Sequence, residues 1–110
     1  MIIRENEVTA LIDQISQPDF LKKTLGFKKA KLDLKNIVVA GHSFGGITAL
    51  GAACADQRVK AAVSLDPWFF PHHIELNAGK FGIKGKDQAT CMIVTEQFYT
   101  YKRNTYDPKY

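Results

Sequence analysis

The segment "GHSFGG", Gly41 to Gly46, follows directly after the apolar run "IVVA". Gly41, Ser43 and Gly45 match the pattern G-x-S-x-G of the nucleophile elbow, in which a serine lies at a sharp turn between a strand and a helix. The two glycines are expected because strand and helix almost touch at this turn. We predict that Ser43 is a nucleophile and that the backbone N–H of Phe44 donates to the oxyanion formed during acyl transfer.

Two phosphate-binding motifs share part of this pattern. The phosphate loop requires a lysine after its last glycine, but Ile47 follows Gly46 here, which excludes that motif. The dinucleotide fingerprint G-x-G-x-x-G has Gly41 and Gly46 in its outer positions, but Ser43 replaces the middle glycine that lets a pyrophosphate approach the backbone. A nucleotide-binding strand–helix–strand module is therefore the weaker alternative.

A serine nucleophile needs a base, and the base needs an acid that orients it. Asp66 follows the apolar run Val59–Leu65, the strand expected after the helix of the elbow. Because catalytic groups gather at the carboxyl ends of parallel strands, Asp66 is expected at the same edge of the sheet as Ser43. We predict that Asp66 is the acid of the triad; the alternative is that Asp66 and Pro67 only form a turn.

The three histidines of the chain do not supply the base. His42 adjoins Ser43, so its side chain is expected to point away from the hydroxyl. His72 and His73 follow Asp66 before the next strand, whereas the base of such a triad normally lies on a loop after a later strand, and we expect both on a surface loop. Adjacent histidines diverge and no third ligand accompanies them, so we predict no metal and no cofactor.

The elements that position these residues are readable from the apolar pattern. "RENEVTALIDQIS" predicts an amphipathic helix ending near Pro18, and the lysine-rich residues 18–35 predict a short helical piece and a connection. A helix is expected from Phe44 through the alanine-rich stretch that follows it. Three apolar runs predict parallel strands: Asn36–Ala40, Val59–Leu65 and Ala89–Thr95. This order predicts the α/β class, with right-handed crossover between parallel strands.

The strand runs are apolar without alternation, which is typical of strands buried on both faces. A chain of 110 residues with this pattern has too few helices to cover both faces of its sheet. We therefore expect residues 1–110 to form the central part of one α/β domain. Cys54 and Cys91 lack a metal or redox spacing and are expected to be small buried hydrophobes.

Composition limits the partners. A 45% hydrophobic content indicates a globular chain, and the net charge of +4 includes lysines gathered between Lys22 and Lys35. No aromatic residues alternate with these lysines, so we expect a solvated face and no nucleic acid, with contact to anionic lipid headgroups as an alternative. No run approaches the about 20 apolar residues of a membrane span. The start "MIIRENEV" shows no secretory signal, and we expect a soluble chain of unassigned compartment.

Three segments together resemble one family. "VVAGHSFGGITAL", "DQRVKAAVSLDPWFFP" and "IVTEQFY" resemble the plasma-type platelet-activating factor acetylhydrolases, also called lipoprotein-associated phospholipases. The resemblance covers nearly the whole chain but only part of that family's catalytic domain. It implies an α/β-hydrolase that cleaves short or oxidised acyl chains from the middle position of glycerophospholipids, without calcium.

The resemblance also assigns roles to residues. It matches Ser43 to the nucleophile, Asp66 to the acid and Phe44 to an oxyanion donor. Trp68, Phe69 and Phe70 match an aromatic stretch beside the acyl pocket, although core packing explains Phe69 and Phe70 equally well. We predict that Trp68 and Phe69 line the substrate pocket.

Two parts of the family's site are expected outside this chain. The histidine base would lie just past Tyr110, and the second oxyanion donor would come from a loop before residue 1. The chain alone is therefore expected to be inactive. A truncated hydrolase that only binds lipid or a protein partner is the alternative to an enzyme.

Overall fold

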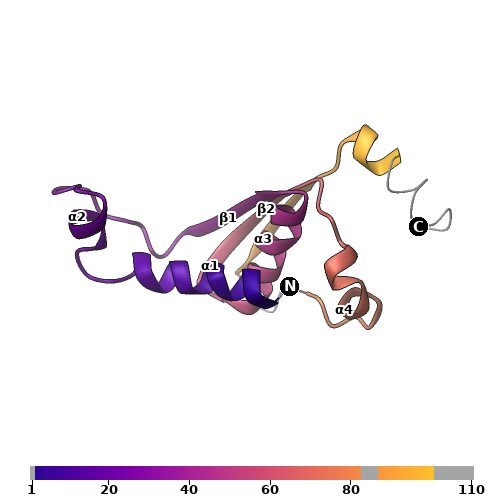
Figure 1. Ribbon diagram of the computed structural model, residues 1–110, viewed down its shortest axis with the longest axis horizontal. Coiled ribbons are helices and arrows are strands. Elements are labelled where there is room, and N and C mark those ends of the chain that lie inside the picture. Colours follow the sequence, from indigo (N-terminus) through magenta and orange to yellow (C-terminus); the bar gives the residue numbers. More distant parts are fainter. Residues whose placement is uncertain (1, 83–86, 101–110) are drawn as a thin grey trace.

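The computed structural model describes residues 2–82 and 87–100 and shows a parallel sheet with helices packed against it (Figure 1). The predicted α/β class is confirmed, and the predicted strands and helices are present with small changes at their ends. The elements in chain order are α1 (Ile2–Ile15), α2 (Phe20–Thr24), β1 (Ile37–His42), α3 (Phe44–Ala55), β2 (Val59–Leu65), the 3₁₀ turn η1 (Phe70–His72), α4 (His73–Asn77) and β3 (Ala89–Ile93).

The three strands pair in the order β1-β2-β3, and both pairings are parallel. His42 at the end of β1 pairs with Leu65 at the end of β2, and Leu65 in turn pairs with Ile93 at the end of β3. The carboxyl ends of all three strands therefore lie in register at one edge of the sheet. The residues that follow these ends are brought together there, although they are far apart in the sequence.

The core lies between the sheet and two helices, α1 and α3, which Figure 1 shows on the same side of the strands. Small residues dominate α3, so its backbone can approach the sheet closely. Ile47 of α3 and Val59 and Ala62 of β2 are completely buried. The full cluster consists of Ile12, Ile47, Leu50, Ala53, Val59 and Ala62.

Helix α1 ends at Ile15, before Pro18, as predicted, but its buried side is not made up of apolar residues alone. Leu11 is 57% exposed, while Glu5 is buried beside Ile12. A carboxylate lies on the inner side because a histidine from η1 binds it, as described below. Burial in α1 is therefore decided by a tertiary partner as well as by apolar spacing.

The prediction that the strands are buried on both faces is wrong for the described residues. Along β1, half-buried residues alternate with exposed ones, and β3 is exposed throughout. Val38 and Met92 are 57% and 50% exposed. Val38 is exposed because α1 and α3 cover only the other face of β1, and no other described element covers its own face. Met92 lies on the same face as the buried Ser64, and it is exposed because neither helix extends over β3 in the described structure.

The cysteines also differ from expectation. Cys91 lies on β3 and is exposed, because β3 forms the edge of the described sheet and neither of its faces is covered. Cys54, near the end of α3, is half-buried. The prediction of buried cysteines is therefore wrong for Cys91 and only partly correct for Cys54.

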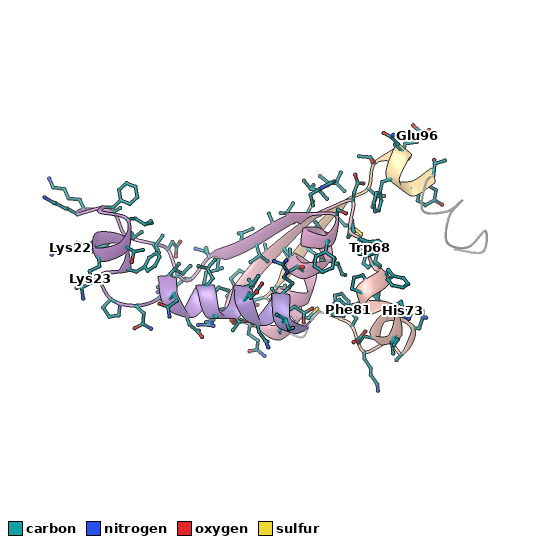
Figure 2. All side chains as sticks on the ribbon, viewed as in Figure 1. Lys22, Lys23, Trp68, His73, Phe81 and Glu96 are labelled. Atoms are coloured by element: carbon teal, nitrogen blue, oxygen red, sulfur yellow. The ribbon has the colours of Figure 1, made fainter. Side chains whose placement is uncertain are left out.

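The lysine-rich segment between α1 and β1 extends away from the sheet as an arm that carries α2 (Figure 1). Figure 2 shows Lys22 and Lys23 on this arm, at the opposite end of the molecule from Trp68. The chain is elongated, with principal extents of 54 × 27 × 24 Å. In the described parts of the chain, no helix is both long enough and apolar enough to cross a membrane.

Candidate active site

Ser43 occupies the corner between β1 and α3. Its backbone angles are φ 54° and ψ −114°, a conformation that side-chain-bearing residues rarely adopt. Two hydrogen bonds hold it there: the Ser43 N–H donates to the carbonyl of Leu65 at 2.8 Å, and the Trp68 N–H donates to the carbonyl of Ser43 at 3.0 Å. The loop after β2 thus holds the serine in a strained conformation that would otherwise cost about 1–3 kcal/mol.

Two glycines of the segment have no room for a side chain. A Cβ atom at Gly41 would overlap the carbonyl group of Gly45, and one at Gly46 would lie 2.8 Å from Ser64 Oγ. Gly45 itself has open space around its Cβ position within the described structure. The structure therefore requires a residue without a side chain at Gly41 and Gly46. At Gly45, the described residues would leave room for a side chain.

Phe44 is the first residue of α3. The first N–H groups of a helix have no intrahelical carbonyl partner, so a helix start directly after Ser43 presents donors beside the serine. The carbonyl of Ser43 accepts from Gly46 at 3.1 Å and Ile47 at 3.3 Å, which closes the first turn of α3. This arrangement can donate to a negative charge that develops next to the serine oxygen.

Asp66 lies directly after β2, at the same edge of the sheet as Ser43. It is buried, with 8% of its surface exposed, and its φ is 43°. Its N–H donates to the carbonyl of Ile93 at 2.8 Å. Its carboxylate accepts two hydrogen bonds from Thr95, one from the N–H at 2.6 Å and one from the hydroxyl at 3.0 Å.

No histidine of the chain completes the pair of Ser43 and Asp66. All three histidines lie in the described part of the structure, and none of them forms a hydrogen bond with Ser43. His42 Nε2 lies 3.9 Å from Asp66 Oδ2, with 69% of the side chain exposed. That distance exceeds a hydrogen bond, and the ring is largely in solvent.

His72 departs from the prediction of a surface loop. It is buried, with 5% of its surface exposed, and its Nε2 lies 2.5 Å from Glu5 Oε1. Its ring packs on Phe81 with ring centroids 4.6 Å apart. The carboxylate of Glu5 reaches this position because Gly51 of α3 has no side chain in its way. His73 is exposed as predicted, and its Nδ1 lies 2.7 Å from the carbonyl of Phe70.

A row of rings extends from the start of α3 along the segment after Asp66. Phe44 and Trp68 have centroids 6.0 Å apart, Trp68 and Phe70 5.7 Å, and Phe70 and His73 5.1 Å. Figure 2 shows Trp68 and His73 on this segment, to the right of the sheet. Phe69 instead packs against the hydrophobic core. Trp68 therefore lies beside the corner of Ser43. Phe69 has a structural role in the core, which explains an aromatic residue at that position.

Two residues of this region were not foreseen from the sequence. Thr95 follows the end of β3, and the rule that placed Asp66 at the carboxyl edge of the sheet would also have placed Thr95 there. Glu5 precedes Val8 and Ile12 by three and seven residues, a spacing that puts its carboxylate on the inner side of α1. Within residues 2–82 and 87–100, no three His, Cys, Asp or Glu side chains gather as a metal site would require.

The chain matches the family model described as "Platelet-activating factor acetylhydrolase, isoform II" over residues 6–107. It is 44% identical over 43 residues to a platelet-activating factor acetylhydrolase of Cavia porcellus, which is 39% of this chain and 10% of that relative. It is 62% identical over 39 residues to Hydrolyase ccsE of Aspergillus clavatus, which is 36% of this chain and 9% of that relative.

A third relative, Hydrolase phmG of Phaeosphaeria nodorum, is 49% identical over 49 residues, which is 44% of this chain and 10% of that relative. The matched stretches thus span about a tenth of the curated relatives' length. The family model, in contrast, matches almost all of the chain, including the corner of Ser43, Asp66 and Thr95. The chain therefore belongs to the family of platelet-activating factor acetylhydrolases, isoform II.

Proposed function

We propose that the complete protein containing this chain is a serine-dependent carboxylic ester hydrolase acting on phospholipids with short or oxidised acyl chains. The observation that carries the proposal is the strained corner at Ser43, held by the loop that also carries Asp66. Strained backbone is typically retained where a site needs it. Membership of the family and the name of the Cavia porcellus relative, a platelet-activating factor acetylhydrolase, support the substrate class.

In the proposed reaction, Ser43 Oγ attacks the carbonyl carbon of the ester and forms a bond to it, while its proton passes to a histidine. The N–H of Phe44 donates to the negatively charged oxygen of the tetrahedral intermediate. The histidine then gives the proton to the departing alcohol as the ester bond breaks, leaving an acyl-serine. Water hydrolyses this acyl group by the same steps, and Asp66 orients the histidine throughout.

That histidine is proposed to come from outside this chain, since the three described histidines are unsuited. His42 is largely exposed, His72 is bound to Glu5, and His73 contacts the carbonyl of Phe70. We accordingly propose that residues 1–110 are the central part of one α/β-hydrolase domain. The uncovered face of the sheet and the unpaired edge of β3 in the described structure support this.

A neutral ester is the second candidate substrate. The chain is 62% and 49% identical to the two fungal relatives, which are named only hydrolyase and hydrolase, against 44% to the Cavia porcellus relative. The ring row of Phe44, Trp68 and Phe70 is apolar and would accept the acyl part of either ester class. The two candidates share the chemistry at Ser43 and differ in the alcohol part of the substrate.

The test uses the complete protein and its Ser43→Ala variant. We expect the wild type to release acetate from a 2-acetyl glycerophosphocholine and to be labelled at Ser43 by a fluorophosphonate, and the variant to lose both. Ser64→Ala is the matched control, because Ser64 is fully buried and its hydroxyl has no hydrogen-bond partner in the described structure. It should retain activity.

Other outcomes separate the alternatives. Hydrolysis of p-nitrophenyl acetate without hydrolysis of the phospholipid would favour the neutral esterase. Absence of both labelling and hydrolysis in the wild type would overturn the proposal; retained binding to phospholipid vesicles would then favour an inactive lipid binder. Protection of the folded protein by added NAD, without labelling of Ser43, would favour the nucleotide-binding alternative.

A further inference from the structure

Within the described residues, the hydrogen bonds to the carboxylate of Asp66 come from Thr95. Thr95 N–H donates to Oδ1 at 2.6 Å, and Thr95 Oγ1 donates to Oδ2 at 3.0 Å. Both carboxylate oxygens are therefore engaged by adjacent donors of a single residue 29 positions away. Two parallel hydrogen bonds to a carboxylate fix its plane as well as its position.

The direction of the Thr95 hydroxyl is fixed by the helical turn that follows. The N–H of Phe98 donates to Thr95 Oγ1 at 3.3 Å, and the N–H of Tyr99 donates to the Thr95 carbonyl at 2.9 Å. A hydroxyl has one proton to donate and two lone pairs. Since Phe98 occupies a lone pair, the proton is free to point at Asp66, and Thr95 serves as the N-terminal cap of residues 96–100.

The backbone of Asp66 needs such support. Its φ of 43° is unusual for a residue with a side chain, and its N–H is bound to the carbonyl of Ile93 at 2.8 Å. With only 8% of its surface exposed, the residue has little water to replace a lost protein donor. His42, at 3.9 Å and largely exposed, is too distant to replace that donor.

We propose that Thr95 is the positioning residue of the triad acid, and that its hydroxyl and N–H hold the Asp66 carboxylate in the orientation that faces the histidine. This inference rests on the proposed function. A carboxylate has about four lone-pair sites, so the two bonds from Thr95 leave room for the N–H of the histidine. Thr95 itself contacts no reacting atom.

The test compares Thr95→Val, Thr95→Ser and Asp66→Asn in the complete protein. Valine keeps the shape and the backbone N–H but removes the hydroxyl donor. We expect Thr95→Val to lower kcat about 10- to 100-fold with little change in KM, as for the loss of one hydrogen bond to a charged group. Thr95→Ser keeps the hydroxyl donor, so its kcat should stay within about threefold of the wild-type value. Thr90→Val, at an exposed threonine of β3, is the matched control and should leave kcat unchanged.

A double variant tells positioning from a merely structural role. In the Asp66→Asn background, Thr95→Val should cost less than about threefold in kcat, because the group that it orients is already lost. An equal cost in both backgrounds would overturn the inference. If Thr95→Val does not fold, Thr95→Ala and Thr95→Ser replace it, since they differ only in the hydroxyl; equal kcat values for these two would also overturn the inference.

The failure of this inference is distinguishable from the failure of the proposed function. A wild-type protein that neither hydrolyses ester nor is labelled at Ser43 overturns both. A wild type that is active and is impaired by Asp66→Asn, but whose Thr95→Val variant behaves like Thr90→Val, overturns only the role of Thr95. Melting temperatures of all variants show whether a loss of kcat reflects unfolding.

Discussion

At the scale of single residues, the site is marked by backbone strain. Among the described residues, three that are not glycine have a positive φ, and two of these three are Ser43 and Asp66. Each follows the end of a strand, and each is fixed by a hydrogen bond to a neighbouring strand end or loop. Each such residue costs about 1–3 kcal/mol, which the surrounding hydrogen bonds offset. Both strained residues lie at the same edge of the sheet.

The contact of Gly41 with Gly45 leads to a prediction about stability. Gly41→Ala would place a methyl group against the backbone of Gly45, so strand and helix would have to separate. We expect the variant to lower the free energy of unfolding by about 1–3 kcal/mol or more, measured by urea denaturation of the complete protein. Gly82→Ala, where the Cβ position is open, is the control and should have a much smaller effect. Equal effects of the two substitutions would contradict the prediction.

At the scale of elements, buried polar side chains join segments that are distant in sequence. Glu5 of α1 and His72 of η1 are 67 positions apart and form a buried pair beside Gly51 of α3. This contact ties the segment after Asp66 to the two helices on the sheet. The row of rings that includes Trp68 lies on the same segment, so the pair also sets the position of the proposed acyl-binding residues.

Removal of one partner of this pair should be costly. Glu5→Ala would remove the hydrogen-bond partner of the buried His72 Nε2, and we expect the free energy of unfolding to fall by about 1–3 kcal/mol. Glu7→Ala is the control: its carboxylate is 3.6 Å from Arg4 on the exposed side of α1, and its loss should cost at most about 1 kcal/mol. A double-mutant cycle between Glu5 and His72 measures their coupling; additive effects would show that the pair is not formed.

A second charged cluster links α1 to the start of β2 and predicts a pH dependence. The pKa of the Asp56 carboxyl is lowered from its usual 3.8, mainly because the Arg58 guanidinium donates hydrogen bonds to it. Arg58 also lies 2.7 Å from Asp13 of α1. Because the folded pKa lies below the unfolded one, this stabilisation is present above about pH 4 and is lost as the pH falls through the lowered pKa.

The measurement compares urea denaturation of wild type and Arg58→Ala at pH 7 and pH 3. We expect the variant to be less stable than wild type at pH 7, and the difference to be smaller at pH 3, because protonation of Asp56 becomes more favourable in the unfolded chain than in the folded one once the pH falls below the usual pKa of 3.8. Lys60→Ala on β2 serves as the control, because no salt bridge to Lys60 is found in the described structure. A difference that stays constant between the two pH values would refute the role of Asp56.

At the scale of the whole molecule, the sheet is covered on one face only. By strand alternation and pairing, the exposed residues Val38, Leu65 and Ile93 lie on one face of the sheet, opposite to the face of the core residues Val39 and Ala62. Parallel sheets are normally covered on both faces. This surface fits the proposal that further parts of an α/β domain pack on the sheet and bring the histidine to Asp66.

Activity of the isolated chain tests this proposal. We expect residues 1–110, purified alone, to hydrolyse p-nitrophenyl acetate at least about a thousandfold more slowly than the complete protein, because the base of the triad is absent. Ser43→Ala in the isolated chain controls for background hydrolysis. Turnover through Ser43 at an ordinary esterase rate by the isolated chain would contradict the proposal.

The local sequence predicted the parts of the fold that depend on neighbouring residues. The apolar runs gave the strands, the alanine-rich stretch gave α3, and the glycines around Ser43 gave the turn, because backbone preference and close packing act over a few residues. The parallel order also placed Asp66 on the same edge of the sheet as Ser43. The catalytic roles of Ser43, Asp66 and Phe44 stay predictions.

The tertiary structure alone decided which side chains are partners and which faces are covered. Thr95 binds Asp66, which is 29 residues away in the sequence, and Glu5 binds His72, which is 67 residues away. The residues next to each partner do not show that these pairs will form. Burial of β1 and β3 likewise depends on where α1 and α3 pack, not on how apolar the strands are. The physical reason is that hydrogen-bond partners and covered surface depend on how the elements pack together. The apolar pattern of one segment does not show which other segments will pack against it.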